Sequence, residues 1–127
     1  MAISKLEKDV WHPYFDNMAH LLEGKRVDIE IDALAIGSQQ EASWLPLLGI
    51  VYDYRNDLLE VALEGLDHLI YHPSEIFVDQ NGVELLSMEV IDADAVRHII
   101  KLRDPLMLPQ PMVSLSGTAA SGQGART

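Results

Sequence analysis

The feature that most constrains the fold is a long apolar stretch at residues 44–79, WLPLLGIVYDYRNDLLEVALEGLDHLIYHPSEIFVD. Residues 47–54 and 58–63 alternate in character with a period of two, which is the period of a β-strand. Arg55, Asn56 and Asp57 form a short polar break that favours a turn. The pattern predicts an antiparallel hairpin. Because the first run has few polar residues on either face, we expect a central strand covered on both sides.

The residues before this stretch predict one helix and one strand. Ser4 and Glu7 have the spacing of a helix capping box. We expect the main helix over residues 13–23, with an earlier turn before it and Gly24 as the left-handed residue that ends it. Residues 25–31 alternate cleanly, as in a strand with one solvated face. The apolar stripe that defines the helix consists of Trp11, Phe15, Met18 and Leu22.

The residues after the stretch predict further short strands and a tail. Residues 75–79 and 83–91 alternate on either side of an Asn-Gly turn. Residues 92–102 fit either a strand or a helix capped by Asp92, and we favour the strand. Residues 109–127 are rich in Pro, Ser, Gly and Ala and lack periodicity, so we expect a disordered tail after a single globular domain at 1–108.

These elements together predict an α+β fold. An N-terminal helix would pack on a strongly bent antiparallel sheet of five to six strands. The sheet could stay open or close as a small barrel of the SH3-like or Sm-like kind. The segment HLIYHPSEIFV is similar in its strand–corner–strand rhythm to the second half of an Sm-like motif. The basic and aromatic positions that Sm-like proteins use to bind RNA have no match here.

Three segments carry a broader resemblance. WLPLLGIVYD, LEVALEGLDHLIYHPSEIFVD and LRDPLMLP resemble a family of small bacterial proteins that is a domain of unknown function. The resemblance covers about residues 4–108 and implies one domain, with no assigned activity. Ala95 departs from it, because the family pattern leads us to expect glycine in the turn before the last strand.

Charge and composition exclude several classes of function. Nine Lys and Arg against twenty Asp and Glu give a net charge of −11, which opposes binding to nucleic acid. No apolar run approaches the ~20 residues that cross a bilayer, so we expect no membrane partner. The chain has no cysteine, which excludes disulfides and thiolate metal sites. We therefore predict an acidic cytoplasmic protein.

The candidate polar residues are two histidines with nearby carboxylates. His68 and His72 are four residues apart, which would form a metal pair on a helix. On a strand the same spacing separates them by roughly 13 Å, too far to share an ion. With Asp53 and Glu75 they define a candidate polar site for an alternative function, a small ligand- or metal-binding protein or an enzyme. No catalytic motif, metal site or cofactor site is otherwise predicted.

Two short apolar runs lie outside the clear alternation and define a candidate interaction surface. The function that we favour is a non-catalytic module that binds or regulates another protein, with a homodimer as one form of this. The sequence names no partner. The surface residues are Trp44, Leu45, Leu106, Met107 and Leu108.

Overall fold

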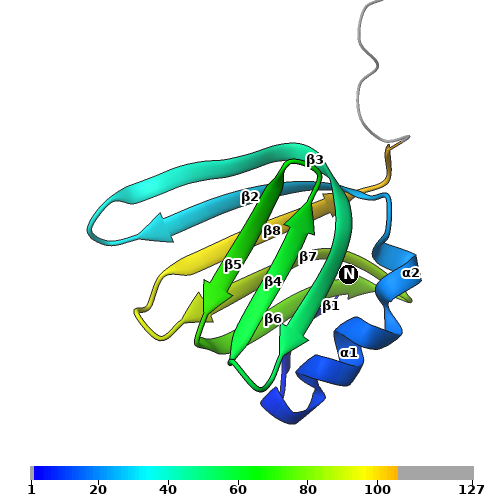
Figure 1. The fold of residues 1–127 in the computed structure, drawn as a ribbon, viewed down its shortest axis with the longest axis horizontal. Helices are drawn as coiled ribbons and strands as arrows, with labels where there is room; N and C mark the ends of the chain where they lie inside the picture. The colour runs from blue at the N-terminus through cyan, green and yellow to red at the C-terminus, as the bar shows by residue number, and fades with distance from the viewer. Residues whose placement is uncertain (1, 106–127) are drawn as a thin grey trace, which may run out of the picture.

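The computed structural model describes residues 2–105, which form one antiparallel sheet of eight strands with short helices beside it (Figure 1). The strand order is β1-β6-β7-β8-β2-β3-β4-β5. The strands are β1 (Ala2–Leu6), β2 (Arg26–Ala33), β3 (Gly37–Asp53), β4 (Leu58–Leu63), β5 (Leu66–Tyr71), β6 (Pro73–Asn81), β7 (Glu84–Asp92) and β8 (Arg97–Arg103).

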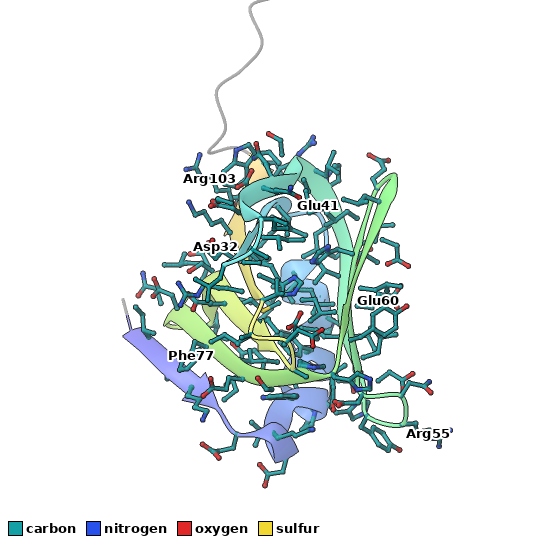
Figure 2. All side chains as sticks on the ribbon, turned by 90° about the vertical axis from the view of Figure 1, so that its left-hand side faces the viewer. Asp32, Glu41, Arg55, Glu60, Phe77 and Arg103 are labelled. Carbon is teal, nitrogen blue, oxygen red and sulfur yellow. The ribbon has the colours of Figure 1, made fainter. Side chains whose placement is uncertain are left out.

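The sheet folds over on itself into two layers that share β3. The larger layer contains β1, β6, β7, β8, β2 and the first half of β3, while the smaller layer contains the second half of β3 with β4 and β5. The smaller layer lies in front of the larger one in Figure 1. Figure 2 shows the two layers edge-on, on opposite sides of the core.

The bend that separates the layers lies within β3. Residues 37–46 pair with β2, and residues 47–53 pair with β4. Trp44 has a φ of +54°, a left-handed conformation that is uncommon for a residue other than glycine. The register of β3 against β4 also shifts between Leu47 and Gly49. Such irregularities bend a strand, which lets β3 continue from one layer into the other.

The core lies between the layers and is closed at one side by the helices. α1 (Trp11–Asn17) and α2 (Ala19–Leu22) run beside β3 and bury their apolar stripe there (Figure 1). The Trp11 ring contacts Tyr52 edge-on at 5.1 Å, and its indole N–H donates to the Leu6 carbonyl at 3.0 Å. The largest fully buried side chains are Trp11, Phe15, Leu22, Ile29, Leu47, Leu59, Ile70, Ile76, Leu85, Met88, Ile100 and Val27.

The predicted fold class is wrong. The described chain is mainly sheet, with eight strands instead of five to six, and the sheet is open because its end strands β1 and β5 do not pair with each other. The additional strand β1 pairs with β6, which is distant in sequence, and residues 37–43 extend β3 along its hairpin partner β2.

The N-terminal helix also differs from its prediction. Ser4 lies in β1, and Glu7 precedes a single 3-10 turn, η1 (Lys8–Val10), without capping it by its side chain. The expected helix at 13–23 is divided at Met18 into α1 and α2. Gly24 is left-handed after α2, as predicted, with a φ of +86°. Residues 97–103 form a strand, which confirms the favoured interpretation of that segment.

Some predictions lie outside the described residues. The boundary at residue 108 and the disordered tail at 109–127 are among them, as are Leu106, Met107 and Leu108 of the candidate surface. They stay predictions.

The two faces of β3 in the smaller layer should respond differently to truncation. Leu47 is 1% exposed and Leu48 is 62% exposed. We expect Leu47→Ala to lower the free energy of unfolding by about 2–5 kcal/mol, as buried leucines do. Leu48→Ala should change it by less than about 0.5 kcal/mol. Denaturant unfolding of both variants measures this difference, and equal losses would contradict the fold.

Candidate functional site

The structure separates the four residues of the candidate polar site. The Asp53 carboxylate accepts hydrogen bonds from the backbone of Arg55 and Asn56 within its own turn. Glu75 forms an ion pair with Lys5 at 3.2 Å. His68 lies in β5 and is buried, while His72 lies beyond the end of β5 and is exposed. The two histidines therefore belong to different clusters.

His68 is the first member of a buried chain of three polar side chains. Its Nε2 lies 3.0 Å from Nδ1 of His98 in β8, and Nε2 of His98 lies 3.0 Å from Oδ2 of Asp92. If Nε2–H of His98 donates to Asp92, then Nδ1 of His98 accepts from His68. His68 and His98 are only 7% and 6% exposed. The chain therefore links the smaller layer to the larger one inside the protein.

The chain shifts the protonation equilibria of its ends. Burial, and then the neighbouring His98, lower the pKa of His68 to about 4. For Asp92, burial alone would raise the pKa. Hydrogen bonds from His98 and from the backbone of Val96 and Asp94 outweigh burial and lower it. A neutral His68 ring and an ionised Asp92 carboxylate follow at neutral pH. With both rings closed to solvent, this arrangement suits joining the layers better than acting on a substrate.

A second polar cluster lies at the surface where two turns meet. The Tyr52 hydroxyl donates to Oδ1 of Asp57 at 2.6 Å, and Nδ1 of His72 lies 3.3 Å from Oδ2 of the same carboxylate. Lys8 forms an ion pair with Asp57 at 3.5 Å. The Tyr52 hydrogen bond lowers the pKa of Asp57 against the opposing effect of burial. Burial and Asp57 together raise the pKa of Tyr52 to about 12.

This cluster holds two residues in left-handed backbone. Asp57 and His72 have φ values of +50° and +54°. The His72 N–H donates to the Asp57 carbonyl at 2.8 Å, and the Ala93 N–H donates to the His72 carbonyl at 2.9 Å. His72 also connects β5 of the smaller layer directly to β6 of the larger one. The cluster fixes the corner where the chain passes between layers.

Trp44 and Leu45 of the candidate interaction surface are half-buried at the bend of β3. The Arg103 guanidinium lies 4.2 Å from the centre of the Trp44 ring, a cation–π contact. Leu45 packs against the core. Both residues thus have partners within the protein.

A more open apolar surface lies on the smaller layer, on the face that points away from the core. We call it the outer face. Leu48, Val51 and Tyr71 are 62%, 53% and 60% exposed. Figure 2 shows Glu60 projecting from this layer away from the larger one. The outer face consists of Leu48, Gly49, Val51 and Asp53 of β3, Leu58, Glu60 and Ala62 of β4, and Asp67, Leu69 and Tyr71 of β5.

The outer face carries a pair of neighbouring carboxyl groups. Register places Glu60 opposite Leu69, and Ala62 opposite Asp67, so Glu60 and Asp67 are diagonal neighbours. A hydrogen bond with Asp67 is the main cause that raises the pKa of Glu60. Two carboxylates this close repel each other when both are ionised.

Sequence reasoning missed the outer face because it interpreted the same residues as a strand covered on both sides. That expectation is wrong for the described chain: β3 is buried on the side of Leu47, Ile50 and Tyr52 and exposed on the other. The sequence does carry one signal of an exposed face: it contains no second amphipathic helix long enough to cover the other side of the sheet. His98 was missed because it lies thirty residues from His68.

Two further properties bear on function. Within residues 2–105, the His, Asp and Glu side chains form no group of three or more that could hold a metal ion. None of the helices in this part of the chain is long and apolar enough to span a membrane.

Comparison with known proteins gives a family without an assigned activity. Residues 2–111 match the family described as "Family of unknown function (DUF5335)". An uncharacterized protein of Aquifex aeolicus is 37% identical over 111 residues, covering 87% of this chain and 100% of the relative. No solved structure matches the chain.

The buried histidine chain predicts a loss of stability in mild acid. An unfolded chain protonates histidine near pH 6.5, whereas folded His68 resists protonation down to about pH 4. The unfolded state therefore binds more protons between these values, and stability falls as the pH drops through them. The expected loss is on the order of 2 kcal/mol after allowance for solvent screening.

Chemical denaturation at pH 7 and pH 4.5 measures this loss. His68→Phe should flatten the pH dependence, while the same change at exposed His20 should leave it as in the parent protein. Equal pH dependence in the parent and in His68→Phe would show that His68 does not control it.

Proposed function

We propose that this chain, which belongs to the DUF5335 family of unknown function, is a non-catalytic module that binds another protein through its outer face. The observation that carries the proposal is an apolar sheet face exposed to solvent in a chain of net charge −11. Contiguous exposed apolar surface is typical of interaction sites.

The geometry of the outer face supports this use. The helices lie beside β3 (Figure 1) and pack toward the core, and the outward side chains of Leu48, Val51 and Tyr71 are exposed within the described chain. A three-stranded layer presents these side chains on a nearly continuous surface. Because the opposite face is fully packed, the strands hold the surface rigidly. A rigid apolar surface loses little conformational entropy when a partner binds.

The charges on the outer face favour a basic partner. The charged side chains on the outer face are Asp53, Glu60 and Asp67, and all three are acidic. A partner with an apolar patch and a central Lys or Arg would place its cation between Glu60 and Asp67. The cation would relieve the repulsion between the two carboxylates and favour the ionised form of Glu60. We therefore propose a basic, partly apolar protein surface as the ligand.

In the alternative function, only one of the two histidines is accessible to a ligand. A ligand-binding site or an enzyme that uses the His68 and His72 region needs both side chains to reach the ligand. His68 is 7% exposed and is engaged with His98. Only His72 of this pair is accessible, so the interaction module is the better-supported function.

Outer-face substitutions test the proposal. A displayed random peptide library is selected on the parent protein, and the affinities of the selected peptides are measured by calorimetry. We expect peptides that combine apolar residues with Lys or Arg. Leu48→Ser with Val51→Ser should weaken their binding about tenfold or more, because exposed apolar contacts would be lost.

The matched control is Leu34→Ser, which changes a fully exposed leucine in the β2–β3 turn, outside the outer face. The control should bind like the parent, and all variants should keep the parent melting temperature. Selected peptides that bind the double variant as tightly as the parent would reject the outer face as the binding surface.

A further inference from the structure

β5 leaves one edge of the sheet open. It is the last strand in the sheet order, and within residues 2–105 it pairs only with β4. Open edges invite pairing with another strand, and proteins commonly protect them with Lys, Pro or a bulge. β5 has the sequence LDHLIY, with no Lys, Arg or Pro and an unbroken register against β4. The opposite edge strand, β1, carries Lys5.

The hydrogen-bonding pattern shows which backbone groups are free at this edge. The His72 N–H donates to the Asp57 carbonyl, so this pair is a hydrogen-bonded pair of the antiparallel ladder. Because such pairs alternate along a ladder, Leu66, His68 and Ile70 direct their N–H and C=O groups toward β4. Asp67, Leu69 and Tyr71 direct theirs away from β4, into the open edge.

We propose that two copies of this chain pair through their β5 edges, antiparallel and with Leu69 opposite Leu69 of the second copy. The three residues with free backbone groups are symmetric about Leu69, so a twofold axis at Leu69 also places Asp67 opposite Tyr71 of the second copy. In this register every free backbone N–H and C=O group of Asp67, Leu69 and Tyr71 has a partner in the second copy. The pairing forms about six backbone hydrogen bonds, two for each of three residue pairs. β5 is therefore complementary to itself.

The side chains fit the same register. Asp67, Leu69 and Tyr71 all project on the outer face, so the register brings two leucines together across the axis. The Tyr71 phenol of each copy then lies beside the Asp67 carboxylate of the other and can donate a hydrogen bond to it. A dimer formed by stacking two outer faces would instead press Glu60 and Asp67 of both copies together. Charge thus favours edge pairing over face-to-face stacking.

The β2–β3 hairpin supports the same arrangement. It extends past β5 on the side of the open edge (Figure 1). Leu34 and Ile36 at its end are 108% and 58% exposed. A second copy joined at β5 would lie alongside this hairpin and could cover these apolar side chains. Edge pairing would also join the two outer faces into one surface, and it is independent of whether the outer face binds a partner.

Cysteine cross-linking tests the pairing in the full chain, which has no native cysteine. Cα atoms of a hydrogen-bonded pair lie about 5.5 Å apart, within the range that a disulfide spans. We expect L69C to form a disulfide-linked dimer under mild oxidation. D67C alone should react about tenfold more slowly, because the two copies of residue 67 would lie roughly 13 Å apart. A mixture of D67C and Y71C should cross-link efficiently.

V51C is the control for a different dimer. Val51 is exposed on the outer face but lies on β3, two strands from the edge. Efficient cross-linking of V51C would indicate face-to-face stacking and overturn the proposal. A monomeric L69C sample, or equal rates for L69C and D67C, would overturn it too.

A charge exchange tests the register by a second route. Tyr71→Asp places a carboxylate opposite Asp67 at two symmetric positions and should raise the dimer dissociation constant about tenfold. Adding Asp67→Lys should restore association, because the new lysine would face the new carboxylate of the other copy. The two positions lie too far apart within one strand for compensation in a single chain. Sedimentation velocity measures the dissociation constants. If Asp67→Lys fails to restore association of the Tyr71→Asp variant, the proposed register is rejected.

Discussion

Burial of the two sheet layers against each other is the constraint on which the rest of the structure depends. One strand, β3, makes it possible because its bend near Trp44 lets the chain pair with β2 in one layer and with β4 in the other. His72 makes the second crossing between layers, and the His68–His98–Asp92 chain joins them through the interior. Among the described residues, folding a single sheet in this way buries the inward side of every strand except β1. It leaves the other side of the smaller layer to solvent.

The local pattern of the sequence predicted part of this fold. The alternation on either side of Arg55 to Asp57 identified β3 and β4 and the hairpin between them, and Gly24 marked the end of the helical region. These features depend on neighbouring residues. The pairing of β1 with β6 depends on contacts between distant segments, whereas β3 continues along β2 in a hairpin whose polar residues 37–41 carry no strand alternation. A capping-box spacing at Ser4 therefore suggested a helix where long-range pairing forms a strand.

The candidate site was predicted less well, for a related reason. Alternation shows that side chains lie on two faces, but not whether another element covers each face. The apolar residues of β3 consequently suggested two covered faces, although Leu48 and Val51 are exposed. Likewise, His68 and His72 are close in sequence, yet the corner at His72 directs them into different clusters. His98 is the actual partner of His68, and only the tertiary structure brings these two residues together.

The most direct test of this account is hydroxyl-radical footprinting of Leu48 and Val51 against Leu47 and Ile50, read by mass spectrometry. It is done first on dilute purified protein and then on the same protein in lysate of its source cells. If the outer face is exposed and binds a partner, Leu48 and Val51 react in the purified protein and become protected in the lysate, while Leu47 and Ile50 are protected in both. Reactivity of Leu48 and Val51 that is low in the purified protein, or unchanged in the lysate, would contradict an exposed face used for binding.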